Sequence, residues 1–562
     1  MPNNPENWLE LRRYTPEKIL HARQVLEEIK RGRDVTLAMR RYPLPGGGYL
    51  PKHILVAAYY QLVESGEWPA DPALLARIRM KPVRTLSGVT TVTVLTKEYP
   101  CPGKCVFCPT EARMPKSYLS DEPGARRGLQ HGFDPYSQVH SRLQALDAVG
   151  HPTDKIELLI LGGTWSAYRR DYQEWFVRRC FEALNDAGSA AAQPSPAPEA
   201  PGLDELQEHN ETAPHRNVGL VIETRPDEIT PGELAWLRRL GVTKVQMGAQ
   251  SLDDRVLGIN RRGHTAAQTL QACALLRAAG FKIVLHWMPN LLGATVESDR
   301  QDFLKLWKSA GEDGGFCPDE IKIYPCQLLE NADLYQYWQR GEYTPYTEQE
   351  LVQLIADVKP SIPTYCRVNR VIRDIPSTHV VAGNKRTSLR QDVALELEKR
   401  GQRCNCLRCR EVGGASVDAS SLVLDDLVYH PAFAEEHFLS YRTPQGQVAG
   451  YLRLSLPRLP ASTGLPGANE LPPLNLPDLE GAALIREVHV YGQSLPVGME
   501  QAGAAQHIGL GTRLLQHAEQ IARQNGYHRA AVIAAIGTRP YYLNRGYTRG
   551  QLYLVKNLDA DG

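Results

Sequence analysis

The sequence predicts an α/β fold: a partial (β/α)6 barrel over residues 86–325, packed against a smaller α/β module over residues 416–562. Two observations support this prediction. Between residues 86 and 320, short β-branched apolar segments alternate with helical patterns, which is typical of a parallel sheet with helical crossovers. Near the C-terminus, an apolar strand, a glycine-rich loop and an amphipathic helix follow one another. Residues 1–85 are expected to form a small helical module, and residues 326–415 to link the two α/β parts.

The N-terminal module is expected to be helical and basic. Thr15 followed by Pro16 is a typical helix start, and apolar residues then recur at helical spacing. The first 100 residues contain 15 Lys and Arg against 10 Asp and Glu. A positive balance favours a phosphate-bearing partner, although charge alone is equally consistent with solvated helix faces. Further candidates for phosphate contact are Arg261, Arg262, Arg367, Arg370 and Arg373. The last three alternate with apolar residues, so they are equally consistent with the polar face of a strand.

Three cysteines lie at the spacing C-x3-C-x2-C just after the first predicted strand of the barrel. They are Cys101, Cys105 and Cys108, and the β-branched run at residues 89–96 precedes them. The carboxyl ends of strands are where α/β folds place their chemistry. Three closely spaced thiolates suit a 4Fe–4S cluster in which one iron stays open to a ligand. A zinc knuckle is the alternative, but zinc needs a fourth ligand nearby, and the next cysteine along the chain is Cys180.

The ends of the later barrel strands carry glycines and polar residues that suit a ligand pocket beside the cysteine loop. The predicted strand at residues 156–161 is followed by Gly-Gly-Thr, where glycines let the backbone approach a ligand closely. A single polar residue at a strand end could equally be a structural cap or a ligand contact. Several such residues beside the predicted iron–sulfur cluster favour a binding site. The candidates are Gly162, Gly163, Thr164, Glu223, Arg225 and Gln250.

A second cysteine group lies in the linker region, at the spacing C-x-C-x2-C. Its members are Cys404, Cys406 and Cys409. The group predicts a structural zinc site that staples the last barrel strand to the next module. Zinc needs a fourth ligand, for which we prefer Cys326 over Cys317 and Cys366. Free thiols in a loop and a second iron–sulfur cluster are the alternatives.

The C-terminal module contains a loop suited to a pyrophosphate. A strand at residues 484–491 is followed by Q-x-x-G-x-G and then by a helix. This order places free backbone N–H groups at a helix N-terminus, where they bind phosphate groups. A later apolar strand at residues 530–535 and a tyrosine pair complete the unit. The candidates are Glu487, Val488, His489, Val490, Gln506, Gly509, Leu510, Gly511, Thr512, Tyr541 and Tyr542.

The composition bounds the setting of the protein. No apolar run approaches the roughly 20 residues of a membrane span, and the N-terminus has no signal-peptide pattern, so no membrane contact is expected. The chain has 11 cysteines, several of them in short motifs, which indicates metal binding in a reducing compartment. We therefore expect a cytoplasmic protein.

The cysteine loop, with an aromatic residue before its last cysteine, resembles that of the radical SAM superfamily, and the glycine-rich loop resembles the acetyl-CoA-binding loop of GNAT acetyltransferases. The pairing of the two is similar to the catalytic subunit of Elongator, from about residue 80 onwards. The strings that carry this resemblance are Lys81-Pro-Val-Arg-Thr85, Ile222-Glu-Thr-Arg-Pro-Asp227, the stretch 260–265, Lys322-Ile-Tyr-Pro325, Arg486-Glu-Val-His-Val-Tyr-Gly492 and the tyrosine pair. The resemblance implies a radical SAM barrel with a 4Fe–4S cluster and S-adenosylmethionine (SAM), and a GNAT domain that binds acetyl-CoA. It also implies tRNA carboxymethyluridine synthase activity, an acyltransferase-class reaction at C5 of the wobble uridine.

The resemblance implies roles for individual residues as well. The three cysteines of the C-x3-C-x2-C motif would hold the cluster. Acetyl-CoA would be contacted by Lys155, Glu487 to Val490, Leu510 to Thr512, and Tyr542. Tyr541 or Tyr542 would protonate the leaving thiolate or orient the thioester carbonyl. Lys155 would pair with a coenzyme phosphate or with that carbonyl. Residues 457–481 are expected to fold over the coenzyme pocket.

Two departures from the eukaryotic members bear on the expected partners. Those members space the first two cluster cysteines further apart, and they lack counterparts of Cys406 and Cys409, so the zinc site is expected as a prokaryotic feature. The expected partners are a tRNA anticodon stem-loop bound in part by residues 1–85, acetyl-CoA and an electron donor, without the eukaryotic partner subunits. A lysine acetyltransferase with a structural iron–sulfur domain is the alternative function.

Overall fold

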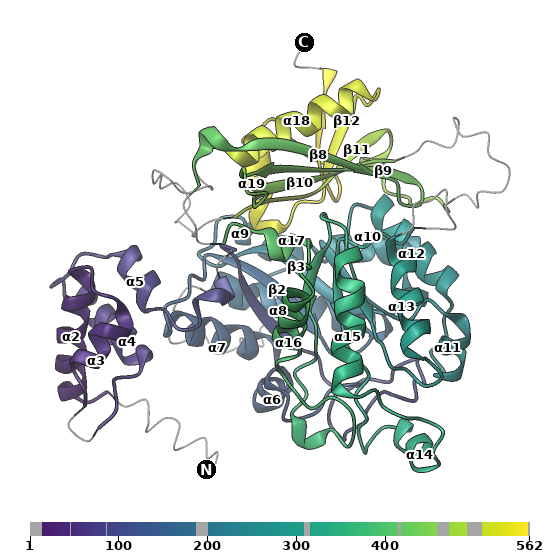
Figure 1. Ribbon diagram of the computed structural model, residues 1–562. Coiled ribbons are helices and arrows are strands. Elements are labelled where there is room, and N and C mark those ends of the chain that lie inside the picture. The colour runs from purple at the N-terminus through teal and green to yellow at the C-terminus, as the bar shows by residue number, and fades with distance from the viewer. Residues whose placement is uncertain are drawn as a thin grey trace.

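The computed structural model of the chain contains two seven-stranded sheets that share one hydrophobic core (Figure 1). It describes residues 14–44, 47–85, 87–186, 201–307, 315–413, 417–457, 471–491 and 509–559. The first sheet belongs to the barrel and the second to the C-terminal module. Within these segments, no helix has the length and apolar character needed to cross a membrane.

The N-terminal residues are helical, as expected, and have a hydrophobic core of their own; the helix at residues 35–41 is one that the sequence did not predict. The helices are α2 (Pro16–Lys30), α3 (Val35–Arg41), α4 (Lys52–Glu64) and α5 (Pro72–Ile78). The side chains of Thr15, Asp34 and Asp71 cap the N-termini of α2, α3 and α5. Figure 1 shows these helices standing beside the rest of the molecule. Nε of Arg79 joins them to the barrel by donating to Gly150 O at 2.7 Å.

The first sheet is parallel throughout and runs in sequence order. Its strands are β1 (Thr90–Leu95), β2 (Lys155–Leu161), β3 (Arg216–Thr224), β4 (Lys244–Gln250), β5 (Lys282–Trp287), β6 (Glu320–Ile323) and β7 (Arg367–Arg370). The intervening helices include α6 (Pro123–Gln130), α7 (Pro135–Asp147), α8 (Arg170–Asn185), α9 (Leu203–Asn210), α10 (Pro231–Arg239), α11 (Asp254–Ile259), α12 (Ala266–Ala278), α13 (Val296–Leu304), α14 (Leu334–Gln339) and α15 (Glu348–Val358). Among the described strands β1 and β7 do not pair, so the barrel is open between them.

This sheet has one strand more than the six expected, and it continues beyond residue 325. The seventh strand, β7, lies in the segment that the sequence suggested as a linker. It pairs with β6, where Val368 lies opposite Ile321. Only Val368 among its four residues is buried, so its apolar signal is weak, and the sequence left a strand as only one of two interpretations of this stretch. After β7 come α16 (Leu389–Lys399) and α17 (Leu407–Arg410).

The C-terminal module is a mixed sheet with helices, as the sequence predicts. Its strands run in the order β13 (Thr548–Arg549), β14 (Leu554–Asn557), β12 (Arg529–Val532), β11 (Ala482–Val490), β10 (Val448–Pro457), β9 (Ala434–Arg442) and β8 (Val423–Tyr429). The pair β11 and β12 is parallel and the other pairs are antiparallel. Helices α18 (Leu510–Gln524) and α19 (Arg539–Leu543) carry the ends of the predicted binding loop and the tyrosine pair.

The C-terminal module covers the amino ends of the barrel strands, as Figure 1 shows. The turn η11 (Ile536–Thr538) packs on the start of β3 so closely that a Cβ on Gly537 would lie 2.6 Å from Cβ of Arg216. Nζ of Lys282, at the start of β5, lies 3.1 Å from Oε1 of Glu487 on β11. The barrel and the module are therefore one packed unit, and the module faces the end of the barrel opposite the cysteine loop.

Candidate active site

The three cysteines of the C-x3-C-x2-C motif lie in the loop after β1, which we call the cluster loop. Sγ of Cys101 lies 3.4 Å from Oγ1 of Thr164 in the turn after β2, and Nη1 of Arg262 donates to Sγ of Cys105 at 3.3 Å. Burial and the neighbouring Cys105 raise the pKa of the Cys108 thiol to about 11. A buried thiol of this kind keeps its proton unless a metal displaces it, so the cluster loop suits metal-bound thiolates.

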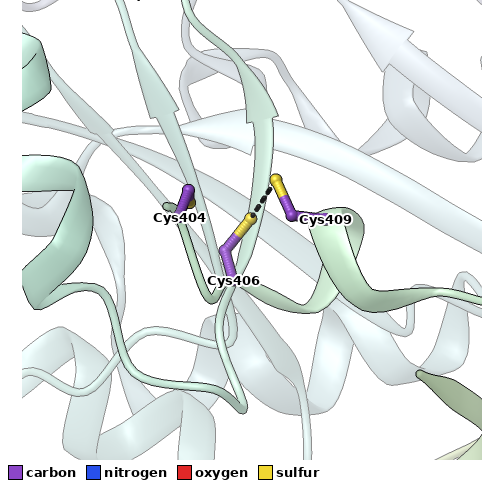
Figure 2. A group of neighbouring side chains, drawn as sticks. All are labelled: Cys404, Cys406 and Cys409. Atoms are coloured by element: carbon purple, nitrogen blue, oxygen red, sulfur yellow. Dashed lines mark hydrogen bonds between the residues drawn. The ribbon is translucent and has the colours of Figure 1, made fainter. Parts of the chain in front are cut away.

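The second cysteine group has a different spacing from the cluster loop. Among the described residues, only Cys404, Cys406 and Cys409 bring three metal-ligand atoms within 4.8 Å of one another, and we call them the zinc cysteines (Figure 2). The Sγ atoms of Cys406 and Cys409 lie 3.6 Å apart, which fits two thiolates on one zinc ion with bonds of about 2.3 Å. Hydrogen bonding with Cys404 and Cys409 lowers the pKa of Cys406. The wider spacing of the cluster loop fits thiolates on different irons of one cluster.

Cys326 does not join the zinc cysteines, contrary to the prediction. It follows β6 at the carboxyl end of the barrel, and it packs in an apolar cluster with Cys105 of the cluster loop. The zinc cysteines lie instead near the amino end of β7, where the backbone N–H of Leu407 donates to Cys366 O at 2.9 Å. The two positions are at opposite ends of neighbouring strands, which the spacing of cysteines in the sequence does not reveal.

The Gly-Gly-Thr turn after β2 has a backbone that requires glycine. Gly162 has a φ of +139° and Gly163 a φ of +92°. A Cβ on Gly162 would lie 1.8 Å from Oγ1 of Thr96, so no other residue fits without a shift of the chain. The turn thereby brings main-chain polar groups beside the cluster loop, where the sequence predicts a SAM-binding pocket.

Unpartnered polar atoms also converge beside the cluster loop. Oε1 of Gln250 and Nη1 of Arg225 are buried and have no hydrogen-bond partner among the described residues. The other nitrogens of Arg225 are engaged, since Nη2 donates to Oδ2 of Asp227 at 2.7 Å and to Arg262 O at 2.9 Å. Arg225 thus chiefly stabilises the rim, and the two N–H groups of its Nη1 have no partner among the described residues. Buried polar atoms without partners are costly, so this basin fits a polar ligand such as SAM.

The C-terminal module brings the end of the glycine-rich loop against the tyrosine pair. Gly509 precedes α18 with a φ of +68°, and a Cβ on Gly511 would lie 2.5 Å from the hydroxyl of Tyr541. That hydroxyl and Nε2 of His489 are buried without a partner among the described residues. Burial lowers the pKa of His489 to about 4 and raises the pKa of Tyr542, so at neutral pH the imidazole is uncharged and the phenol keeps its proton. Such groups suit the thioester end of acetyl-CoA.

The other predicted coenzyme contacts lie in different surroundings. Glu487 is occupied by the barrel interface, since Nζ of Lys282 and Nε of Arg453 both lie about 3 Å from its carboxylate. Lys155, at the start of β2, is half-buried, and burial lowers its pKa. Gln506 and most of the segment 457–481, namely 458–470, lie outside the described residues. Val488, Val490, Gly511 and Thr512 line the cavity described next, whereas Leu510 packs in the core.

One cavity of about 1670 Å³ joins the cluster loop to the tyrosine pair. It includes Cys108 and Gln250 at the carboxyl end of the barrel and His489 and Tyr542 at the amino end. Lys155 lines the same cavity. The two predicted cofactor sites therefore face each other through the interior of the barrel, a relation that motifs alone do not reveal.

The interior of this barrel is lined by polar side chains, which the sequence analysis did not identify as part of the site. Nζ of Lys244 lies 2.8 Å from Glu157 and 3.1 Å from Glu320. Full barrels usually fill this space with branched apolar side chains. The signal in the sequence is the alternation within β4 and β6. Gln246 and Lys322 line the cavity, whereas their neighbours along each strand pack in the core.

Three of the arginines expected to contact phosphate have structural roles instead. Arg262 is buried against the cluster loop. Arg367 pairs with Glu411 and Arg373 pairs with Glu122, each at 2.8 Å. The sequence showed their charge but not the carboxylates that the fold places opposite them.

Comparisons with known proteins agree with this geometry. Residues 100–306 match the Radical SAM superfamily and residues 318–399 the Radical SAM C-terminal domain, which includes β7. A radical SAM domain implies a 4Fe–4S cluster and SAM. The cluster loop, the Gly-Gly-Thr turn and the unpartnered atoms beside them fit both groups.

Several relatives match most of the chain. A tRNA uridine(34) acetyltransferase of Methanocaldococcus jannaschii is 38% identical over 501 residues, covering 86% of this chain and 87% of that protein. A tRNA uridine(34) acetyltransferase of Dehalococcoides mccartyi is 40% identical over 480 residues, covering 85% and 99%. Elongator complex protein 3 of Homo sapiens is 32% identical over 504 residues, covering 86% and 87%. The solved structure of Methanocaldococcus infernus Elp3 with an N-terminal deletion aligns with a TM-score of 0.68 at 35% identity, covering 84% of this chain and 99% of that one. The chain therefore belongs to the family of the tRNA uridine(34) acetyltransferases and Elongator complex protein 3, the catalytic subunit of Elongator.

Proposed function

We propose that this protein attaches a carboxymethyl group, derived from acetyl-CoA, to C5 of the wobble uridine of tRNA. The observation that carries the proposal is the single cavity that joins the cluster loop to the tyrosine pair. A reaction that uses both ends needs its reacting atoms within about 3.5 Å of one another, and one shared space provides for that. Relatives named tRNA uridine(34) acetyltransferase support the same substrate.

The residues around the cluster loop would carry out the first half of the reaction, the generation of the radical. Cys101, Cys105 and Cys108 would hold the 4Fe–4S cluster, and the Gly162 turn with Gln250 would hold SAM beside it. Together these groups would supply, when bound, the radical chemistry for hydrogen abstraction from the acetyl methyl group. Burial of Cys105, Val106 and Phe107 would limit the access of water to this part of the loop.

The residues of the C-terminal module would bind and orient acetyl-CoA. Its pyrophosphate would lie at the N-terminus of α18, where the first-turn N–H groups have no intrahelical partner. Tyr542 keeps its proton at neutral pH and is positioned to donate a hydrogen bond to the thioester carbonyl or to the departing thiolate. The unpartnered hydroxyl of Tyr541 and Nε2 of His489 are the further polar contacts available there. Lys155 would bind a coenzyme phosphate or the carbonyl.

The open side of the barrel would admit the anticodon loop. The cavity extends to the opening between β1 and β7, and basic side chains line it on both sides of that opening. They are Lys81, Arg127 and Arg142 on the β1 side, and Arg370 and Arg408 on the β7 side. Cations there would hold phosphates while the uridine turns out of the loop into the barrel. The basic helices of residues 14–85 would hold another part of the tRNA.

The zinc cysteines would hold a structural zinc ion between the barrel and the C-terminal module. Of the three candidates for a fourth ligand, Cys366 is the one beside them, since Cys406 contributes to the raised pKa of its thiol. From the likeness to the archaeal and bacterial tRNA uridine(34) acetyltransferases we infer that the protein acts without the partner subunits of the eukaryotic complex. It still needs an external electron donor for the cluster.

The test is mass spectrometry of tRNA nucleosides after anaerobic reaction of the reconstituted protein with SAM, acetyl-CoA and a strong reductant. We expect 5-carboxymethyluridine from the wobble position, dependent on both small molecules. Transfer of acetyl groups to lysine without SAM cleavage would replace the proposal with a lysine acetyltransferase. Formation of 5′-deoxyadenosine with unmodified tRNA would also contradict it.

A further inference from the structure

The target base has to lie in the middle of the cavity. Its C5 must meet a carbon that is held from the C-terminal module and is activated beside the cluster loop. The side chains that line this middle part come from three neighbouring strands: Gln246 of β4, His286 of β5 and Lys322 of β6. Tyr324 lines the cavity just beyond β6. Nothing assigned so far explains why these polar groups are buried there.

Lys322 differs from the other lysines inside the barrel. Nζ of Lys244 lies 2.8 Å from a carboxylate oxygen and Nζ of Lys282 lies 3.1 Å from one. Lys322 pairs with no carboxylate among the described residues, and its ammonium group donates only to Oε1 of Gln246. Its side chain is buried. An ammonium group in this position retains N–H donors that point to the cavity, because it offers three and uses one.

Gln246 also presents a donor to the cavity. Lysine can only donate, so the atom of Gln246 that faces Lys322 must be the amide oxygen. Nε2 of His286 lies 3.2 Å from the same oxygen and fills its second acceptor position. Burial lowers the pKa of His286 well below its usual value, so the ring is neutral and donates there from Nε2. The amide nitrogen of Gln246 has no partner among the described residues, which leaves its N–H groups for a ligand.

The geometry points to a base-reading site in which Lys322 and Gln246 bind the carbonyl edge of uracil and reject cytosine. This inference rests on the proposed function and specifies its substrate. Uracil presents acceptor oxygens at C4 and C2, whereas cytosine presents an amino donor at C4. The donors of Lys322 and Gln246 pair with O4, whereas an N4 amino group would face the ammonium group of Lys322. The ring of Tyr324 lies beneath the ammonium group of Lys322, with its centroid 5.7 Å from Nζ, and helps to hold that group in the cavity.

The test measures RNA affinity by anisotropy with the full-length protein, its cluster reconstituted anaerobically and no SAM added. The probes are anticodon stem-loops that differ only in U or C at the wobble position. We expect the wild-type protein to bind the U probe at least about tenfold more tightly, as for a hydrogen bond to a charged group. Lys322→Met should reduce that ratio to near one. The salt dependence of binding should stay the same, because Lys322 contacts no phosphate.

Two further variants exclude a purely structural effect. Lys322→Gln replaces a donor-only group with one that donates and accepts, and should bind the C probe better than the wild type does. Lys244→Met removes a neighbouring lysine of the barrel interior that is paired with Glu157 and Glu320. It should lower the thermal midpoint but keep the wild-type ratio, whereas Lys322→Met should not lower the midpoint.

Each outcome decides the inference. A wild-type ratio near one, a wild-type ratio retained in Lys322→Met, or a collapse of the ratio in both Lys322→Met and Lys244→Met would overturn the base-reading site. Loss of all RNA binding by a stable Lys322→Met would also overturn it, because phosphate contacts supply most of the affinity. If the wild type discriminates U from C but forms no 5-carboxymethyluridine, the proposed function fails and the base-reading site stands.

Discussion

Replacing Asp319 by Asn should destabilise the whole chain, because this carboxylate joins the two halves of the protein. Its side chain is fully buried, and Arg486 of the C-terminal module donates to it from Nη1 at 3.1 Å and from Nη2 at 2.5 Å. Nη1 of Arg453 lies 3.4 Å away, and the backbone N–H of Ile283 donates at 2.8 Å. Asn keeps the shape but removes the charge that compensates two buried arginines.

The size of the effect follows from two independent arguments. Breaking a buried ion pair by removing one partner costs about 3–5 kcal/mol. Burial alone would raise the pKa of Asp319, but Arg486, Arg453 and Arg277 lower it from 3.8 to about 2. A shift of this size corresponds to about 2–3 kcal/mol at roughly 1.4 kcal/mol per unit. We therefore expect Asp319→Asn to lower the free energy of unfolding by about 3 kcal/mol at neutral pH.

Urea denaturation followed by circular dichroism measures this loss. The folded-state pKa is depressed, so the stabilisation is complete above 3.8 and disappears as the pH falls toward 2. The difference between wild type and variant should thus be constant at neutral pH and shrink on acidification. Asp357→Asn is the matched control, since its pairs with Arg300 and Arg400 are partly exposed and should be worth less than about 1 kcal/mol. A loss in Asp319→Asn no larger than in this control would refute the reasoning.

Three further substitutions separate the individual sites. Gly162→Ala places a Cβ 1.8 Å from Oγ1 of Thr96, so SAM affinity measured by equilibrium dialysis should fall at least about tenfold with unchanged iron content; unchanged affinity would contradict the assigned turn. Cys406→Ser should remove about one zinc per chain while iron is retained, as measured by elemental analysis, and retained zinc would exclude this site. Gly511→Ala places a Cβ 2.5 Å from the hydroxyl of Tyr541, and should weaken acetyl-CoA binding about tenfold by calorimetry while SAM binding is unaffected; a parallel loss of both would indicate misfolding.

The fold was largely predictable because its signals are local. Alternating apolar strands and helices identified the barrel, and the order of strand, glycine-rich loop and helix identified the C-terminal module. Cys101, Cys105 and Cys108 were recognisable for the same reason, since their chemistry depends on spacing within one loop. A motif that is complete in one short segment needs no tertiary information.

The remaining features depend on contacts between distant segments. The strand β7 was only one of two interpretations of the arginines at 367–373, because only Val368 in it is buried and its pairing with β6 decides its structure. Cys326 was assigned wrongly, because the sequence does not show at which end of the barrel residues 404–409 pack. Lys322 became a candidate for base recognition only when the fold showed that its ammonium group has no carboxylate partner among the described residues. The burial of Asp319 against Arg486 likewise depends on how two separate sheets pack.

The most direct measurement follows deuterium from acetyl-CoA labelled on its methyl group. In the proposed reaction, the radical formed beside the cluster loop reacts through the barrel interior with acetyl-CoA bound by the C-terminal module. The hydrogen that it removes must therefore come from the acetyl methyl group. We predict one deuterium in the 5′-deoxyadenosine formed during turnover with tRNA, and two in the carboxymethyl group of the product. Unlabelled 5′-deoxyadenosine, formed in step with carboxymethyluridine, would contradict the account.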